Sequence, residues 1–315
     1  MITRLKQRII DRLGITRLAE TAIGAEAAVQ ESERRRAELG ARVEDLERSL
    51  HGERDRLDSA LADHAQRLRI AEHTLWSATA PLRHEPTIGI VLATRDRAAL
   101  LPAAIDSVRA QTYPRWHLVV VDDGSGDDTP ALLREIAGHD ERVTIERTDG
   151  VGAAAARNAG LDRVTGEFVA FLDDDNALHP GWLRAIAEYT GRVASTDALF
   201  GAQLREDPLG DTPLPRMWFT PTITVEELRR DNAIDLGALA VRRDHPELRF
   251  DASLDRYIDW EMIVRIAATT GIDPLPVVSS CYTLRAAGSR ISDLDDGRLD
   301  AMRERLAGAP DRDDA

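Results

Sequence analysis

Cysteine and long apolar runs are almost absent from this 315-residue chain, and each absence excludes a class of protein. The one cysteine, Cys281, rules out a disulfide within the chain and is typical of a reducing compartment. Because it lies in the apolar stretch PVVSSCYTL, we interpret it as a buried, unreactive thiol. No stretch reaches the roughly 18 apolar residues of a membrane span, and the first residues lack the pattern of a secretory signal. These features predict a cytoplasmic protein.

The chain is also poor in basic charge relative to acidic charge. Its 41 Lys and Arg face 55 Asp and Glu, so the formal net charge is −14. A protein that coats nucleic acid needs a broad basic face, and this balance argues against a nucleic-acid partner. With 43% hydrophobic and 30% charged residues, the chain can bury one substantial core and carry an appendage.

Proline is missing from the first 80 residues, and Pro81 is the first. Within this segment, positions that step by four and three residues are apolar at nine of eleven places, and the residues between them are mostly charged. This pattern predicts a coiled coil with one stutter near Leu50, most simply a homo-oligomer formed with a second copy. A single charged helix that packs back on the main domain is the alternative. The seam positions are Leu39, Val43, Leu46, Leu50, Arg54, Leu57, Leu61, His64, Leu68, Ala71 and Leu75.

The first eighteen residues differ from the seam because they carry five basic residues against one acid. Ile2, Leu5, Ile9 and Leu13 fall on one face of a helix. A basic amphipathic helix can lie on an anionic membrane surface, which would place the protein at the inner face of the membrane. Packing against a partner helix explains the pattern equally well, so both interpretations stay open.

From Thr87 onward, apolar strand-like runs alternate with helical patterns, and the turns between them are short. Such alternation predicts an α/β fold with a mainly parallel sheet covered by helices on both faces. The predicted strands are 88–93, 117–123, 142–147 and 167–172, and each is followed by a helix. We therefore expect a helical extension over 1–80, an α/β domain over 81–292, and an acidic, frayed tail over 293–315.

Polar residues follow three of these strands at the point where each strand ends. They are Thr94, the pair Asp122-Asp123, and the triplet Asp173-Asp174-Asp175. Ligands bind at the carboxyl ends of parallel strands, so these side chains should converge on one edge of the sheet. Three consecutive carboxylates repel one another unless water or a cation offsets the charge. The triplet is therefore either a solvated turn or a site for something positive.

The order of the segments VVVDDGS, ARNAG and FLDDDN resembles the family 2 glycosyltransferases of the GT-A fold, closely over residues 87–190 and loosely to about 290. No GxGxxG follows the first strand and no GxxxxGK[ST] is present, which weakens dinucleotide and P-loop readings. The resemblance implies transfer of a sugar, with inversion, from a nucleotide-diphosphate sugar, with a UDP-type donor favoured. The acceptor would be a saccharide, a lipid-linked saccharide or a protein, in cell-surface polysaccharide or glycoconjugate synthesis.

The same resemblance implies a divalent cation and assigns residues to the donor. Carboxylate oxygens would hold Mn²⁺ or Mg²⁺ on one side and diphosphate oxygens on the other. By resemblance, Asp173 and Asp175 form the D-x-D pair, Asp175 is a direct metal ligand, and Asp173 or Asp174 reaches the ribose. The remaining donor-binding residues would be Thr94, Asp122 and Asp123 around the base, Arg157 and Asn158 at base or phosphate, and Arg285 at the diphosphate.

The resemblance also places a general base at Asp259, which on residue type alone would be a helix-capping acid. The family pattern has an acid before this residue, where this chain has Ile258, and Glu261 matches a second acid that could orient the acceptor. Trp218, in a proline-punctuated loop, could stack on an acceptor sugar or lie in the core. Two other classes stay open: a nucleotidyltransferase that acts on a sugar phosphate, and a non-catalytic coiled-coil assembly protein with a vestigial sugar-nucleotide domain.

Overall fold

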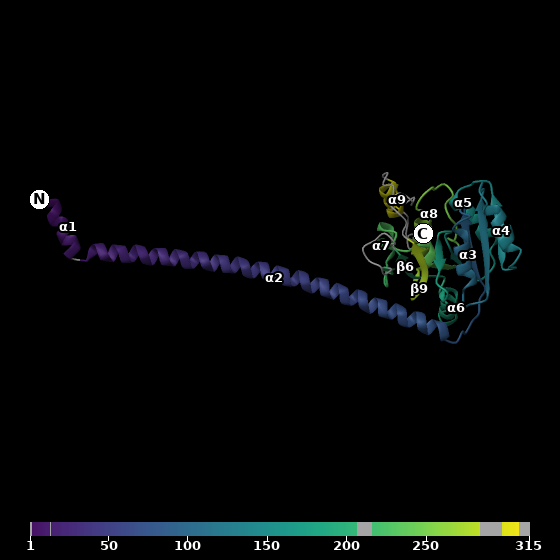
Figure 1. Cartoon of the computed structure of the whole chain (residues 1–315), viewed down its shortest axis with the longest axis horizontal. Helices are drawn as coiled ribbons and strands as arrows, with labels where there is room; N and C mark the ends of the chain where they lie inside the picture. The colour runs from purple at the N-terminus through teal and green to yellow at the C-terminus, as the bar shows by residue number, and fades with distance from the viewer. Residues whose placement is uncertain (1, 13, 207–215, 284–297, 309–315) are drawn as a thin grey trace. The chain divides into compact units, whose positions relative to one another are not determined.

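The computed structural model describes residues 2–12, 14–206, 216–283 and 298–308 (Figure 1). The chain divides into two compact units, Met1–Gln66 and Arg67–Ala315. The second unit therefore begins before the boundary near residue 80 that the first proline suggested, and the reason lies in the last turns of the long helix.

The first unit is helical, as the sequence predicts. Helix α1 spans Ile2–Arg12, and α2 spans Ile15–Thr79, whose residues up to Gln66 belong to this unit. Ion pairs at helical spacing, such as Arg34 with Glu38, line its surface. The predicted seam leucines from Leu39 to Leu61 are all exposed, so the chain itself does not cover the apolar stripe.

The last turns of α2 belong to the second unit because they are packed into it. Ile70 is fully buried against Ala202 and Val278, and the Thr74 hydroxyl accepts a hydrogen bond of 3.1 Å from the backbone N–H of Val278. Arg184 donates to the carbonyl oxygens of Ala78 and Ala80 at 2.8 and 2.6 Å. These contacts fix the carboxyl end of the helix on the α/β unit.

One mixed sheet forms the centre of the second unit, in the order β3-β2-β1-β4-β8-β6-β9-β5, with β7 on β6. The first four strands of that order are parallel, as predicted, whereas β8 is antiparallel to both β4 and β6. The bounds are β1 (Ile88–Thr94), β2 (Trp116–Asp123), β3 (Val143–Thr148), β4 (Phe168–Phe171), β5 (Asn176–Leu178), β6 (Ala198–Glu206), β7 (Arg216–Trp218), β8 (Leu239–Arg242) and β9 (Asp273–Thr283).

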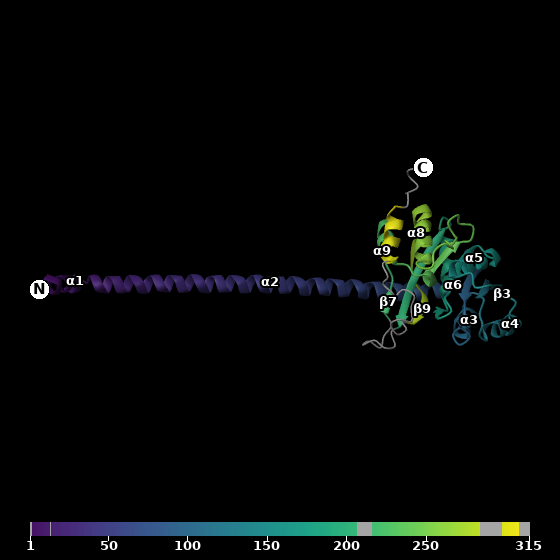
Figure 2. The same ribbon diagram turned by 90° about the horizontal axis from the view of Figure 1, so that it is seen from above.

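Helices cover both faces of this sheet (Figure 2). Successive strand residues face opposite sides, so Ile90 packs with α3, α4 and α6 while its neighbour Val91 packs with α5 and α8. Strands that are buried on both faces have continuous apolar sequences, and these apolar runs are why the sequence predicts the strands. The bounds are α3 (Leu101–Arg109), α4 (Thr129–Ala137), α5 (Ala153–Arg163), α6 (Trp182–Arg192), α7 (Val225–Arg230), η1 (Leu236–Ala238), α8 (Ile258–Thr270) and α9 (Arg298–Ala307).

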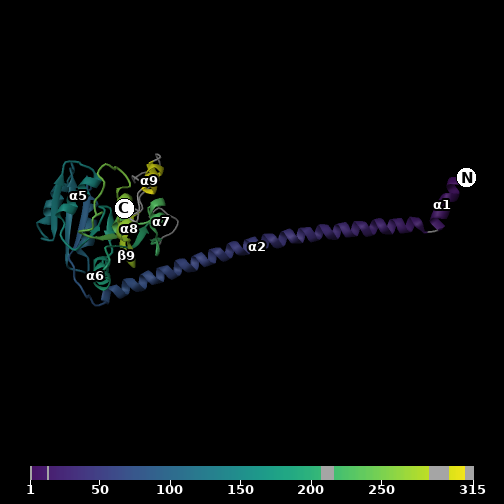
Figure 3. The same cartoon turned by 180° about the vertical axis from the view of Figure 1, so that it is seen from behind.

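The expectation of a frayed tail is wrong for residues 298–307, which form α9 beside α7 (Figure 3). Met302 and Leu306, four residues apart, are buried in the same core cluster as α8. Charged residues on the exposed side of this helix hid its short apolar stripe. No helix in the described part of the chain is both long and apolar enough to cross a bilayer.

Candidate active site at the carboxyl edge of the sheet

The three polar strand ends meet at one edge of the sheet, as predicted. Thr94, the last residue of β1, pairs in register with Asp122 of β2. Its hydroxyl donates a 2.7 Å hydrogen bond to Asp174 Oδ2, in the turn that follows β4. A single threonine therefore joins the ends of β1 and β4, and the acidic triplet lies beside the β2 end rather than alone in solvent.

Asp122 is held within the fold. It is 2% exposed, its Oδ1 accepts from the backbone N–H of Ser125 at 2.9 Å, and its Oδ2 pairs with the Arg147 guanidinium on β3. Arg147 also donates to the Ser125 carbonyl oxygen at 3.1 Å. Both oxygens are thus engaged by the turn, which points to a role in shaping the pocket and not to contact with a nucleotide.

Asp123, the next residue, fixes the loop between β3 and α5. Its carboxylate accepts from the Thr148 hydroxyl at 2.7 Å and from the backbone N–H groups of Val151 and Gly152 at 2.7 and 2.9 Å. Burial alone would raise its pKa, but these three hydrogen bonds outweigh burial and the pKa is lowered. Asp123 is therefore ionised, and a carboxylate has about four acceptor positions, so one remains for a donor.

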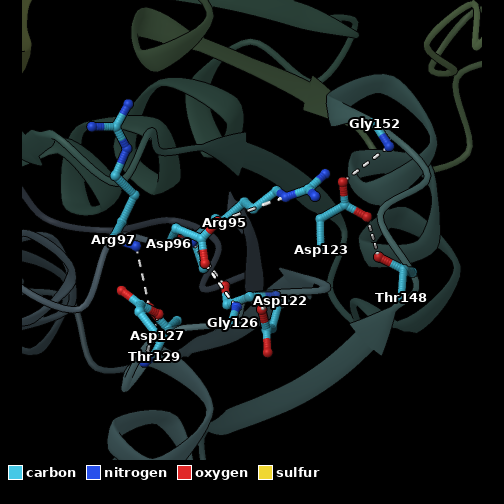
Figure 4. A network of polar contacts seen from close by, with 12 residues as sticks. Arg95, Asp96, Arg97, Asp122, Asp123, Gly126, Asp127, Thr129, Thr148 and Gly152 are labelled. Carbon is cyan, nitrogen blue, oxygen red and sulfur yellow. Dashed lines mark hydrogen bonds and ion pairs between the residues drawn. The ribbon is translucent and has the colours of Figure 1, made fainter.

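The loop after β1 is clamped to the loop after β2 (Figure 4). Asp96, with a left-handed φ of 54°, accepts from the Gly126 N–H at 2.7 Å, and its own N–H donates to the Ser125 hydroxyl at 2.9 Å. The clamp places Arg95 so that its side chain extends toward Asp123, and its guanidinium lies next to Gly150. Arg95 belongs to the polar strand end Thr94-Arg95-Asp96 that was expected at this edge, although no role was predicted for it.

Arginines partly neutralise the triplet. Arg157 on α5 donates to Asp173 Oδ1 at 2.6 Å, and Arg97 Nε lies 3.9 Å from Asp174 Oδ1. Burial raises the pKa of Asp174 to about 6; the Thr94 hydrogen bond and Arg97 oppose the rise, while Asp175 and Asp173 add to it. Asp175 is half-buried in the same turn. Arg157 was predicted to contact the ligand or to form a salt bridge, and in the structure it pairs with Asp173.

The donor set at the triplet can be compared with the needs of a divalent cation. Among the described residues, no three His, Cys, Asp or Glu are arranged to hold a metal unaided. Mg²⁺ often needs only one or two protein carboxylates, because substrate phosphates and water complete its shell. The next residue, Asn176, is buried, and neither polar atom of its amide has a hydrogen-bond partner in the described part of the chain. Hard oxygen donors and an unsatisfied amide fit a cation shared with a diphosphate.

Asp259 lies in the first turn of α8, two residues after the N-cap Tyr257, which has a left-handed φ of 55°. Burial raises the pKa of Asp259; the Arg157 guanidinium opposes the rise, and Asp173 adds to it. Arg157 therefore acts on Asp259 as well as on the donor-side Asp173, so the predicted base stands beside the triplet. A carboxylate with a raised pKa takes up a proton more readily than an ordinary one.

Asp235 is a site residue that sequence reasoning missed. Its carboxylate accepts from the Gly237 N–H at 2.9 Å and from the Gln203 side chain. Burial raises its pKa to about 6, with Asp173 and Asp259 as the next contributors. Asp235 shortly precedes the strand β8, which returns beside β4; the run ALAVRR predicts this strand, but not that Asp235 would reach the acidic triplet.

Two predicted site residues are engaged elsewhere. Asn158 was expected at the base or phosphate, but its amide makes both hydrogen bonds to the backbone of Phe250, at 2.8 and 2.9 Å. Glu261 was expected to orient the acceptor or the helix, and Arg265, one helical turn on, holds both its oxygens at 2.8 and 3.0 Å. Asn158 thus ties α5 to the segment before α8, and Glu261 orients Arg265, which donates to the Glu247 carbonyl oxygen in that segment.

Trp218 lies on strand β7 and not in a loop. Its indole N–H donates to the Ala233 carbonyl oxygen at 2.9 Å, and the Arg205 guanidinium lies 3.6 Å from the ring centre. The side chain is 38% exposed, so the ring is neither a core residue nor a free lid. Arg285, the predicted diphosphate contact, lies outside the described residues.

Comparisons with known proteins agree with this geometry. Residues 89–243 match the family described as Glycosyl transferase family 2. YwdF of Bacillus subtilis, an uncharacterized glycosyltransferase, is 28% identical over 65% of this chain and 77% of its own length. TuaG of the same organism, a putative teichuronic acid biosynthesis glycosyltransferase, is 28% identical over 52% of this chain and 64% of its own, just under two thirds.

Among solved structures, TarS of S. aureus (residues 1–349) superposes with a TM-score of 0.53 over 70% of each chain, at 18% identity. This similarity concerns the fold, and it extends past the residues that the family match covers. The family match, the relatives in sequence and the shared fold lead to one assignment: the chain is a glycosyltransferase of family 2, with the GT-A fold in its second unit.

Proposed function

We propose that the protein transfers a sugar from a nucleotide-diphosphate sugar to a cell-surface glycan acceptor, with inversion at the sugar. The observation that carries this proposal is the position of Arg157, which bonds Asp173 at 2.6 Å and acts electrostatically on Asp259. Donor-side and acceptor-side carboxylates thus belong to one cluster, as a direct displacement requires.

The nucleotide would occupy the pocket between the ends of β1 and β2. Asp123 has an acceptor position left for a ring N–H of the base, and Arg95 stands beside it. TarS, which shares the fold, has been solved in complex with UDP and with UDP-GlcNAc. We therefore favour a UDP-type donor, with Thr94 and Asp122 holding the pocket walls in place.

A divalent cation would be held by Asp175 and Asp173, with Mn²⁺ or Mg²⁺ the ions that such oxygens suit. When bound, the ion offsets the negative charge that the carboxylates and the diphosphate bring together. Asp174 is fixed by Thr94 at 2.7 Å and would support the turn or reach the ribose. Arg157 would keep Asp173 oriented whether or not donor is bound.

Asp259 would act as the general base. As the acceptor oxygen attacks the anomeric carbon, its proton would pass to the Asp259 carboxylate, while the nucleotide diphosphate departs from the opposite side of the sugar. Burial favours the protonated product of this step. The family pattern has an acid directly before the base, where this chain has Ile258. Asp235 would instead supply the second carboxylate beside Asp259.

The acceptor class follows from the relatives and not from the site. TuaG is described as acting in teichuronic acid biosynthesis, which supports a cell-surface polysaccharide acceptor, either free or lipid-linked. We place the reaction in the cytoplasm at the membrane, where residues 1–18 could bind anionic lipid through four net positive charges. Assembly through the N-terminal helix is a separate proposal that does not depend on this reaction.

The test is a screen of sugar nucleotides for metal-dependent hydrolysis and transfer, with Asp259→Asn as the decisive variant. Asparagine keeps the size of the side chain but cannot take a proton, so turnover should fall by about 10²–10⁴. Calorimetric affinity for the nucleotide should stay as in the parent. Asp300→Asn, an 81% exposed carboxylate in the first turn of α9, is the matched control. Near-parent turnover in Asp259→Asn would refute the assignment of the base.

A further inference from the structure

The exposed stripe of α2 is the largest feature that the proposed reaction does not use. Leu39, Val43, Leu46 and Leu50 are each more than half exposed, and Leu57 and Leu61 continue the stripe. A helix of 65 residues cannot cover such a stripe by itself, and leaving it in water costs about 25 cal/mol per Å² of apolar surface. The stripe therefore needs a partner with its own apolar seam.

The seam is longer than the segment first identified. Counting back from Leu39 in steps of three and four gives Arg36, Ser32, Val29, Ala25, Ala22 and Leu18. Of these, Leu18 and Val29 are large, apolar and exposed. The heptad pattern thus runs from Leu18 to Leu75 with one stutter between Leu50 and Arg54, and four of its positions are polar: Ser32, Arg36, Arg54 and His64.

The seam is open even where the helix is packed on the second unit. In the last turns, Leu68, Ala71 and Leu75 are exposed, whereas Ile70 and Ser77 are buried. At 100° per residue, Ile70 points about 140° away from the middle of the seam. In these last turns the helix therefore packs on the α/β unit with one face and leaves the seam face exposed.

We infer that α2 pairs with α2 of a second copy of this chain, in a parallel, in-register, two-stranded coiled coil from Leu18 to Leu75. In this arrangement each polar seam position meets its own copy, so the leucine layers stay apolar. The stutter of one helix also meets the stutter of the other, so both helices unwind at the same level. Val43 at an a position, with Leu39 and Leu46 at the flanking d positions, favours two strands.

An antiparallel pair is disfavoured by the same positions. Matching the stutters in antiparallel orientation places Leu50 opposite Arg54, Leu39 opposite His64, and Arg36 opposite Leu68. Arg36, Arg54 and His64 would then each face a leucine and lose water without gaining a partner.

Charges at the edges of the seam also favour the parallel pair. Arg42 and Glu47, at positions g and e of successive heptads, attract across a parallel in-register pair. Arg67 and Glu72 repeat this spacing beyond the stutter.

Mass and cross-linking of the full chain test the inference. Light scattering should give twice the chain mass at micromolar concentration. Leu57→Glu with Leu61→Glu should give a monomer, and Ser59→Glu with Ala62→Glu, which add the same charge on the outer face, should leave the dimer intact. A parent chain that is monomeric, or larger than a dimer, would overturn the proposal.

Orientation is decided by single cysteines at seam positions. Leu39→Cys and Leu57→Cys should each oxidise to a covalent dimer, because a d residue meets its own copy only in a parallel, in-register pair. Ala41→Cys and Ser59→Cys, on the outer face, are the matched controls, and the parent shows the background from Cys281. Failure of both seam variants to cross-link in a dimeric protein would show another register or orientation.

Discussion

Asp122 and Asp123, the last two residues of β2, have different partners because successive strand residues face opposite sides of the sheet. Asp122 is tied to Arg147 and the following turn, whereas Asp123 holds the loop before α5 and keeps an acceptor position for a ligand. A sequence shows both as equal members of a DDGS turn. Their separate roles appear only when β3 supplies Arg147 and Thr148 from either side of the strand end.

Removing the ion-pair partner of Asp122 should lower the free energy of unfolding. Arg147→Met keeps most of the side-chain volume but leaves a carboxylate that is 2% exposed without its counter-ion. An unpaired buried charge costs on the order of 3 kcal/mol, so the urea midpoint should fall markedly. Arg163→Met, which breaks a more exposed pair with Glu146, should cost about 1 kcal/mol or less. Equal effects of the two variants would contradict the structural role of Asp122.

Asp235 should make stability depend on pH. Its pKa is about 6 in the folded chain against 3.8 as the ordinary value. The unfolded chain therefore loses this proton first as pH rises, and stability falls between about pH 4 and 6. Asp235→Asn can still accept from Gly237 but never ionises. At pH 7.5 its free energy of unfolding should exceed that of the parent by at most about 3 kcal/mol, so it should melt at a higher temperature. At pH 4 the two proteins should be equally stable.

The control for this variant is Asp231→Asn, an exposed residue nearby, which should leave the melting temperature unchanged at both pH values. An Asp235→Asn protein that gains nothing at pH 7.5 would show that the carboxylate is not held in the cluster with Asp173 and Asp259.

At the scale of elements, α5 approaches the sheet closely at Gly160. A Cβ on Gly160 would lie 2.6 Å from Val91 Cγ1 and 3.1 Å from Val121 Cγ2. Gly160→Ala should therefore destabilise the second unit by about 1–3 kcal/mol in urea unfolding and displace Arg157 on the same helix. Gly126→Ala, whose Cβ would meet only Asp96 Oδ1 at 3.9 Å, should change little. A neutral Gly160→Ala would mean that α5 can shift away from the strands.

The sequence predicts well those elements whose own residues show the pattern of burial. Strands β1 to β4 are continuous apolar runs that end in polar residues, and the structure places them within a residue or two of the predicted bounds. Strands β5 and β7 have three residues each and exist only because β9 and β6 lie beside them. The same dependence on distant partners explains why Asp235 was not predicted and why the contact between Asn158 and Phe250, 92 residues apart, could not be seen in the sequence.

For the whole molecule, the boundary at Arg67 predicts how the chain can be shortened. A chain that begins at Arg67 keeps Ile70 and Thr74 and should be a stable monomer that binds nucleotide. A chain that begins at Leu82 loses the burial of Ile70, worth about 2 kcal/mol, and the acceptors of Arg184. It should melt at a lower temperature.

In the full chain, Ile70→Ala should destabilise the second unit by about 2–4 kcal/mol, while Leu75→Ala, 73% exposed, should not. If the two shortened chains melt at the same temperature, the last turns of α2 contribute nothing to the second unit.

The strands that carry the end of α2 also carry part of the site. On β6, Ala202 packs against Ile70, and the next residue, Gln203, contacts Asp235. On β9, Val278 packs against Ile70, and Ser280 accepts from Gln203 at 3.3 Å. Because Ala202 and Gln203 are joined by one peptide unit, a movement of the end of α2 would displace the side chain that contacts Asp235. A shift of residues 70–79 against β6 and β9 should therefore alter the surroundings of Asp235 as well as the packing of Ile70.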